Sequence, residues 1–281
     1  MNGGGSGHPG GYLWFFYGSS GGATRVELFG NGQLDISLHY APGITIGSLE
    51  GDGDVFLGSF NLSIGSNALS TTFSGVIHDG GTNGGAAGSL IKVGSGTLAL
   101  DGQSTYTGGT TVSEGVLLTN TQGGSATGTG AVQVAAGTFG GSGTIAGAVT
   151  IGTGSGSGAF LAPATGTNKQ RTLTVQSQLT LNGDSTYTYT FKAKNEKAKT
   201  DKVIANGVTI NSGATFVFSG TAQGTLTQGL VLTVISNTAA TPISGSFSNL
   251  SDGAIVSVNG NNLQASYEGG DGNDLTLTVV P

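Results

Sequence analysis

Glycine is the feature that most constrains the fold of this chain, because 55 of its 281 residues are glycine. The glycines follow no Gly-X-Y period and proline occurs only five times, which excludes a collagen-like triple helix. A helical protein is also disfavoured, since each glycine inside a helix costs roughly 0.5–1 kcal/mol relative to alanine. Hydrophobic residues reach 36% and charged residues only 9%, unlike a solvated disordered chain. The composition predicts a folded protein with many tight turns.

Alternation of apolar and polar residues recurs along the whole chain, whereas helical periodicity is nearly absent. Examples are 97–100 (TLAL), 131–134 (AVQV) and 215–218 (TFVF), each followed or preceded closely by a turn-forming residue. The chain is therefore expected to be all-β. Short strands separated by turn signals fit a sandwich, a barrel or a β-solenoid.

Recurrent segments such as 43–47 (GITIG), 61–65 (NLSIG) and 147–152 (GAVTIG) favour a parallel β-solenoid (β-helix) among these folds. In a solenoid, each coil pairs with the next and inward side chains stack into apolar columns. With roughly 20 residues per coil, the chain would form about a dozen coils, with possible irregular caps at both ends. The inward columns are expected to include seven aliphatic residues: Leu98, Leu100, Val112, Val132, Val134, Val149 and Ile151.

A glycine-rich segment, residues 1–24, precedes the solenoid that we expect over residues 25–281. Its centre is an apolar run, which would be prone to aggregation if it formed an exposed strand. We expect this run to be covered, either as a cap on its own first coil or by β-strand addition to a neighbouring subunit. The candidate assembly residues are Tyr12, Leu13, Trp14, Phe15, Phe16 and Tyr17.

Residues 192–202 hold five of the seven lysines, after a cleanly alternating segment, 186–191 (TYTYTF). A solvated hairpin loop is the expected structure for this lysine-rich loop. A patch that binds polyanions is the alternative, although Glu196 and Asp201 dilute its positive charge.

The charge and cysteine content narrow the partners and the compartment. A formal net charge of −6 makes nucleic acid an unexpected partner. The absence of cysteine excludes disulfides and zinc–thiolate sites, and it fits an exported bacterial protein. The run at 12–17 is far shorter than the roughly 20 residues that span a bilayer, so we expect no transmembrane segment. We identify no signal peptide, so an exported chain would be processed or a fragment.

Two acidic clusters are weak candidates for calcium sites: Glu50, Asp52 and Asp54, and Asp271 with Asp274. The first cluster would place its carboxylates on one side of an extended segment, where they could hold Ca²⁺ or act as a pair in glycoside cleavage. Neither cluster offers the six to eight oxygen ligands that Ca²⁺ prefers. We therefore expect turns, no bound metal and no cofactor.

The three histidines lie in separate contexts, and His78 and Asp79 would face opposite sides of a strand. Catalytic residues are not expected. A polysaccharide-active β-helix enzyme is an alternative function, but its site would need basic residues beside acids. Arginine, which could supply such a basic residue, occurs only at Arg25 and Arg171, and the lysines are concentrated in one region.

Residues 92–117, KVGSGTLALDGQSTYTGGTTVSEGVL, closely resemble the autotransporter-associated β-strand repeat, also called the passenger-associated transport repeat. The chain departs from that pattern at Ser104, where Asn is usual, and at Val116, where Thr is usual. The resemblance implies a right-handed β-solenoid displayed at a bacterial surface, with no catalytic residues in the repeat.

The resulting expectation is a non-enzymatic extracellular structural or adhesive solenoid, an autotransporter passenger-like rod at the outer cell surface. A self-assembling subunit of an extracellular filament is the alternative. The expected partners are the chain itself, as a homo-oligomer or filament, or host and surface glycans.

Overall fold

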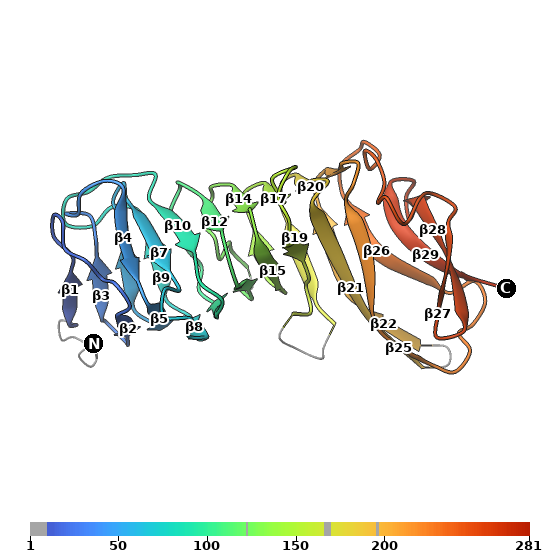
Figure 1. Ribbon diagram of the computed structural model, residues 1–281, viewed down its shortest axis with the longest axis horizontal. Coiled ribbons are helices and arrows are strands. Elements are labelled where there is room, and N and C mark those ends of the chain that lie inside the picture. The colour runs from blue at the N-terminus through green and yellow to red at the C-terminus, as the bar shows by residue number, and fades with distance from the viewer. Residues whose placement is uncertain (1–9, 122, 166–169, 195–196) are drawn as a thin grey trace. The chain divides into compact units, whose positions relative to one another are not determined.

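The computed structural model describes residues 10–121, 123–165, 170–194 and 197–281, which form 29 β-strands (Figure 1). None of these residues is helical, so the described part of the chain contains no helix that could cross a membrane. The strands fall into two compact units. Unit 1 contains residues 1–137 and 143–148, and unit 2 contains residues 138–142 and 149–281.

Unit 1 is a stack of coils whose strands form three parallel sheets. The first sheet has the order β1 (Tyr12–Trp14), β3 (Gln33–Asp35), β6 (Asp54–Phe56) and β9 (Val76–His78). The second contains β4 (Gly43–Ile46), β7 (Asn61–Ile64), β10 (Ser89–Lys92), β12 (Thr110–Val112) and β14 (Val132–Val134). The third contains β2 (Arg25–Leu28), β5 (Ser48–Gly51), β8 (Thr71–Phe73), β11 (Thr97–Leu100) and β13 (Val116–Thr119). A short strand, β16 (Thr144–Ile145), also belongs to this unit.

The parallel pairing stacks equivalent side chains of successive coils on one another. In the first sheet, Leu13, Leu34, Val55 and Ile77 follow one another in register. The last three are fully buried. All seven residues that the sequence placed in the core are at most 1% exposed, which confirms the solenoid.

Unit 2 continues with parallel pairing and ends in antiparallel pairing. Parallel strands are β17 (Val149–Ile151), β20 (Leu179–Leu181) and β24 (Val208–Ile210) in one sheet, and β19 (Thr172–Val175), β23 (Lys202–Ala205) and β26 (Val231–Asn237) in another. A third sheet holds β15 (Gly137–Gly141, all but Gly137 in this unit), β18 (Ala159–Leu161), β21 (Ser185–Lys194), β22 (Lys197–Thr200) and β25 (Thr215–Gln223). From β26 onward, β29 (Asp274–Val280), β28 (Asn261–Gly269) and β27 (Ile255–Val258) pair antiparallel.

The length of a coil varies along the chain, so the single coil length expected from the sequence is wrong for several coils. In unit 1, Leu34 pairs with Val55, which agrees with the expected length, but Leu62 pairs with Leu90, which lies 28 residues later. In unit 2, Val149 pairs with Leu179 and Leu179 with Val208, so each of these coils is half as long again as expected. Longer connections between strands, such as the one between β17 and β18, take up part of the extra length.

The N-terminal segment is joined to unit 1 through the parallel pairing of β1 with β3, although the sequence placed a boundary at residue 24. Residues 1–9 lie outside the described residues.

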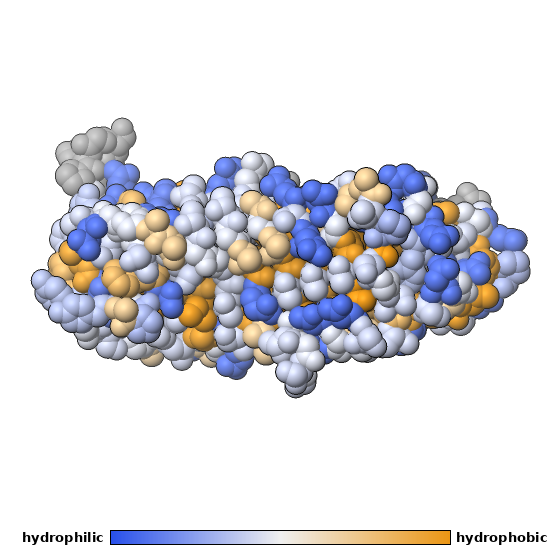
Figure 2. Space-filling model, turned by 90° about the horizontal axis from the view of Figure 1, so that it is seen from above, coloured by the Kyte–Doolittle hydropathy of each residue, from blue (hydrophilic) through white to orange (hydrophobic). Residues whose placement is uncertain are grey.

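On the face seen in Figure 2, apolar side chains form separate patches among polar and weakly polar ones. This is the pattern expected when alternate residues of each strand face solvent.

Lys92 occupies an inward position that the alternation assigns to an aliphatic residue. In register it lies between Ile64 and Val112, and it is 1% exposed. Its ammonium donates hydrogen bonds to the carbonyl oxygens of Val93 (2.7 Å) and Gly94 (2.6 Å). A third bond, of 3.2 Å, reaches the carbonyl of Glu114 in the next coil. The charge is therefore buried with hydrogen-bond acceptors from two coils, which a buried ammonium requires.

Gly115 makes room for this ammonium. Its φ of +70° lies in the left-handed region that favours glycine. A Cβ at this position would lie 2.8 Å from Nζ of Lys92 and would collide with backbone carbonyl groups of the preceding coil. The glycine of the repeat is thus required by both its backbone conformation and the buried lysine.

Replacement of Lys92 with Met should change how stability depends on pH. Burial lowers the pKa of Lys92 from 10.5 to about 8, and the carboxylate of Glu114 partly opposes this shift. Between pH 8 and 10.5 the unfolded chain therefore binds more protons than the folded chain at this site, so folding gains stability as pH rises. The free energy of unfolding of the wild type, measured with urea, should rise relative to Lys92→Met by up to about 3 kcal/mol over this range. Other titrating groups are common to both proteins and cancel. A difference that stays constant from pH 7 to 10.5 would contradict the buried charge.

Candidate functional site

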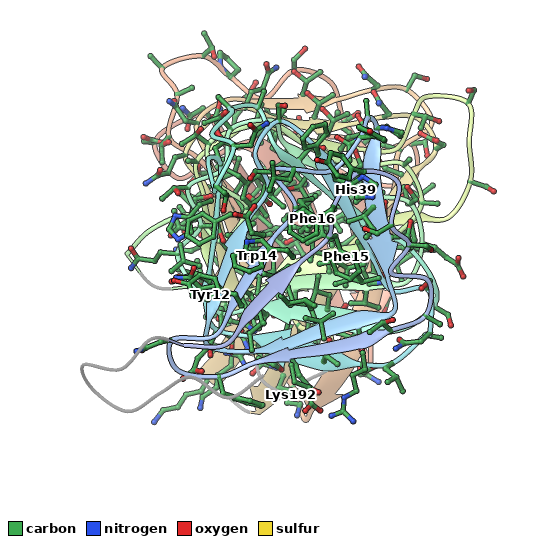
Figure 3. The ribbon with its side chains drawn as sticks, turned by 90° about the vertical axis from the view of Figure 1, so that its left-hand side faces the viewer. Tyr12, Trp14, Phe15, Phe16, His39 and Lys192 are labelled. Atoms are coloured by element: carbon green, nitrogen blue, oxygen red, sulfur yellow. The ribbon has the colours of Figure 1, made fainter. Side chains whose placement is uncertain are left out.

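The N-terminal aromatic run is the candidate functional site. Its alternate side chains face opposite sides of the first sheet (Figure 3). Leu13 and Phe15 face inward and are half-buried. Tyr12, Trp14 and Phe16 face outward, with 43–45% of each side chain exposed. The run therefore covers its own first coil with one face and presents aromatic rings to solvent with the other.

The exposed rings form a continuous series, which we call the aromatic row: Tyr12, Trp14, Phe16, Tyr17 and Tyr40. The rings of Tyr12 and Trp14 are nearly parallel, with centroids 5.2 Å apart. Trp14 and Phe16 follow at 6.0 Å, and Phe16 and Tyr17 at 6.4 Å. The last pair, Tyr17 and Tyr40, is separated by 5.4 Å. These distances lie within the range of aromatic pair contacts, so each ring helps to orient the next.

Tyr17 ends the alternation because its backbone is left-handed, with a φ of +51°. This conformation is uncommon for a bulky residue. It directs the Tyr17 ring outward, so the rings of two successive residues, Phe16 and Tyr17, both face outward. The adjacent coil holds Tyr17 in place, since the amide of Tyr40 donates to its carbonyl oxygen at 2.9 Å. The buried imidazole of His39 lies 2.8 Å from the carbonyl oxygens of both Ser19 and Tyr40. The end of the aromatic row is therefore fixed by contacts between two coils.

Tyr40 was not among the predicted assembly residues. Its separation from Tyr17 along the chain is close to one coil length of unit 1, and the bridge between Tyr17 and His39 brings it beside the run. From the sequence, only the number of residues per coil could have indicated that Tyr40 lies beside Tyr17. That number is irregular in this chain, so the exact partner of Tyr17 was not predictable.

The backbone of β1 has one edge that no described residue pairs with, because β1 is the first strand of its sheet. Phe15 donates its amide to Asp35, and Gln33 donates to Gly11. The odd-numbered residues of β1 thus bond to β3. Since successive peptide groups of a strand point to opposite edges, the amides of Tyr12 and Trp14 face the outer edge. This is the geometry that strand addition requires, and pairing with a second copy remains a prediction.

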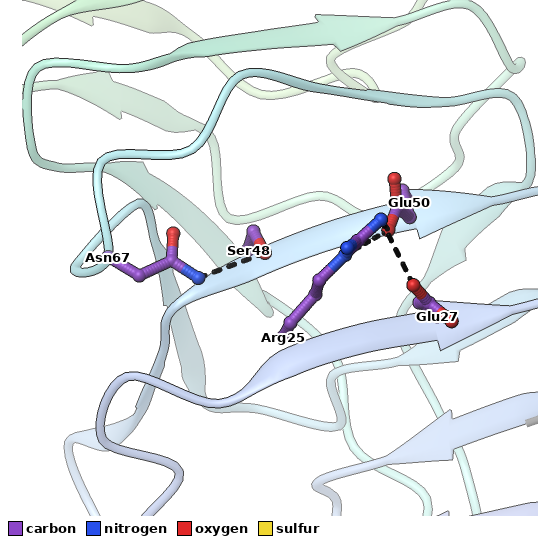
Figure 4. Close-up of polar contacts among 5 residues, drawn as sticks. All are labelled: Arg25, Glu27, Ser48, Glu50 and Asn67. Atoms are coloured by element: carbon purple, nitrogen blue, oxygen red, sulfur yellow. Dashed lines mark hydrogen bonds and ion pairs between the residues drawn. The ribbon is translucent and has the colours of Figure 1, made fainter.

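The first group of calcium candidates is divided between two sheets. Glu50 belongs to β5 and Asp54 to β6, with a bend at Asp52, so the three carboxylates do not line one side of an extended segment, which the alternative of a calcium site would require. Glu50 forms an ion pair with Arg25, which also contacts Glu27 at 3.0 Å (Figure 4). Two neighbouring residues of the same region, Asn67 and Ser48, are joined by a side-chain hydrogen bond of 3.1 Å in Figure 4.

Two of the remaining acidic candidates, Asp52 and Asp274, also have protein partners. Asp52 accepts a hydrogen bond from the amide of Gly30 at 2.7 Å. Asp274 accepts one from the amide of Asn237 at 2.8 Å, at the start of β29, and Asp271 lies in the turn before this strand. Burial raises the pKa of Asp274, although the Asn237 bond opposes this shift. Within the described residues, no three His, Cys, Asp or Glu side chains are grouped so that they could hold a metal ion.

His78 lies in a row of polar side chains on the outward face of the first sheet. Its Nε2 is 3.4 Å from Oδ1 of Asp54, and its Nδ1 is 3.1 Å from the hydroxyl of Thr105. The imidazole also stacks on Phe56, with centroids 5.1 Å apart. The Asp54 contact is longer than an ordinary hydrogen bond, so the row is not a tight acid–base triad. His8 lies outside the described residues.

Comparison with known families identifies one segment. Residues 90–118 match the family model described as the passenger-associated-transport-repeat. This confirms the resemblance observed over residues 92–117. The matched segment contains β11, β12 and most of β10 and β13, so it covers two successive coil positions of unit 1. The match indicates an autotransporter passenger-like surface protein. No curated protein matches the chain.

Calcium should not stabilise this protein. Neither candidate cluster by itself offers the six to eight oxygen ligands that Ca²⁺ prefers, and Glu50, Asp52 and Asp274 already have protein partners. A ligand that binds only the folded state raises the melting temperature. We therefore expect the melting temperature in millimolar CaCl₂ to equal that in EDTA, with MgCl₂ as the control for ionic strength. An increase that is specific to calcium and reversed by EDTA would identify a site.

Proposed function

We propose that this chain is a non-enzymatic, extracellular structural or adhesive β-solenoid of a bacterial surface protein. The match at residues 90–118 carries this proposal, because the matched segment lies within a run of parallel coils rather than in an isolated module. Because each coil contacts only its neighbours, a stack of coils can form an extended surface without a central core that holds catalytic residues. The exposed aromatic row provides a contact surface on such a structure.

The surroundings of Arg25, Lys92 and Arg171 support a role without catalysis. Arg25 is paired with Glu27 and Glu50, and the guanidinium of Arg171 donates to the hydroxyl of Ser142 at 3.2 Å. Lys92 is buried with backbone acceptors. An enzyme acting on acidic sugars needs cations that face its substrate beside a general base. These three cations instead serve contacts within the protein.

Self-assembly is the second candidate function, and the open edge of β1 is the observation that favours it. A strand edge next to exposed Tyr12 and Trp14 offers unpaired backbone groups together with apolar contact area. Strand addition would satisfy the backbone groups, and the rings would be covered by the partner. Subunits associated in this way would form oligomers or filaments at the cell surface.

Surface display tests the first proposal. The chain is placed between a signal peptide and an outer-membrane translocator, and protease is added to intact cells. We expect the wild type to be cleaved from outside. Leu98→Asp should reduce the surface-exposed amount several-fold, because it buries an unpaired charge in a coil of the repeat. The matched control Ser113→Asp changes an exposed residue and should be displayed normally. Retention of the wild type inside the cell would contradict the proposal, as would equal display of Leu98→Asp.

Trp14→Pro and Trp14→Ala test self-assembly separately from surface display. Proline removes the outward amide of an edge strand, while the bonds of Leu13 and Phe15 to β3 can remain. Alanine removes the same ring and keeps the amide. In analytical ultracentrifugation we expect the wild type to associate, Trp14→Ala to associate more weakly, and Trp14→Pro to be at least tenfold weaker than Trp14→Ala. A monomeric wild type would contradict self-assembly, and equal loss in both variants would contradict strand addition.

A further inference from the structure

The lysines of unit 2 create a local charge opposite to that of the rest of the chain. Residues 192–202 contain five lysines and two acids, a net charge of +3, whereas all other residues together carry −9. One of the two acids, Asp201, is fully buried and accepts hydrogen bonds from the amides of Arg171 and Thr190. Its carboxylate therefore serves the interior rather than the lysine-bearing surface. We call β21 and β22 together the lysine hairpin.

The register of the lysine hairpin places like charges opposite each other. Strands β21 and β22 pair antiparallel, with Lys192 opposite Lys199 and Lys194 opposite Lys197. Residues directly opposite in such a pair have Cβ atoms about 4.5–5.5 Å apart, and like charges there are destabilising. The side chains of Lys192, Lys197 and Lys199 are all exposed. The pairing therefore concentrates positive charge on one outward face.

Protection of a sheet edge does not explain this arrangement. Lysines on an edge strand prevent pairing with other chains, and β22 is such a strand. However, β21 is an internal strand, because it pairs with β22 on one side and with β25 on the other. Lys192 on β21 protects no edge, and it adds positive charge to the face that carries Lys197 and Lys199. An anionic partner would be attracted to this concentration of positive charge.

We propose that the outward face of the lysine hairpin binds an anionic polysaccharide. Thr188 precedes Lys192 on the same face of β21, where it is half-buried and its hydroxyl can hydrogen-bond to sugar hydroxyls. Duplex DNA carries a charge about every 1.7 Å along its axis and would require a more extended basic surface than one hairpin on a chain of net charge −6. A flexible polymer with spaced carboxylate or sulfate groups can contact the lysines of one hairpin without requiring an extended basic surface.

This inference adds a partner to the proposed extracellular role, but its test uses the purified chain and does not depend on export. The probes are dextran sulfate and dextran, which share a backbone and differ in charge. Binding is measured by biolayer interferometry at 50 mM and 500 mM NaCl. We expect the chain to bind dextran sulfate at the lower salt concentration, to be released at the higher one, and not to bind dextran.

Three double variants locate the binding site. Lys192→Gln/Lys199→Gln should weaken binding at least tenfold, while Lys192→Arg/Lys199→Arg should bind within twofold of the wild type. The control Thr45→Glu/Leu69→Glu changes the net charge by the same amount at exposed positions of unit 1 and should leave affinity within threefold. The melting temperature of the glutamine variant should be unchanged or slightly higher, because like charges have been removed. Equal binding by the glutamine variant, binding to dextran, or tighter binding to duplex DNA or phosphatidylglycerol vesicles than to dextran sulfate would overturn the proposal.

Discussion

Parallel pairing between successive coils is the constraint on which the rest of this structure depends. It places each residue beside the equivalent residue of the next coil, so the side-chain type at one position is repeated along the stack, as in the column of Leu34, Val55 and Ile77. The same rule applies outside the core, where it brings Tyr40 beside Tyr17. It also dictates where glycine is needed, because backbones of adjacent coils approach closely at the turns. The unusual glycine content and the aromatic row therefore have one physical origin.

Lys92 shows how a column can include a charge without losing its order. Its methylene groups continue the column between Ile64 and Val112, and its ammonium leaves the column to bond to carbonyl groups at the turn. These acceptors belong to two coils, so the lysine ties together the turns that follow β10 and precede β13. A methionine would fill the same space but would leave the carbonyl groups without this donor. The repeat thus combines apolar stacking with one specific polar contact.

The sequence predicted those features that depend on local alternation. The buried state of Leu98, Val112 and Val149 follows from the two-residue period, and the turns follow from glycine. Contacts between coils were harder to predict, because the coil length varies along the chain. For this reason the pairing of Arg25 with Glu50 was not foreseen. The antiparallel pairing after β26 was likewise hidden, since antiparallel and parallel strands share the same alternation.

The burial of Lys92 has a consequence for the chemistry of its amine. In the closed coil, reagents that acylate lysine cannot reach Nζ, although the lowered pKa leaves a larger fraction of unprotonated, nucleophilic amine near neutral pH than an ordinary lysine has. Acylation then requires the coil to open, and its rate reports the frequency of local opening. Because an acylated side chain keeps one N–H donor in place of three, each modified molecule would close less favourably. The repeat therefore contains its own irreversible reporter of coil opening.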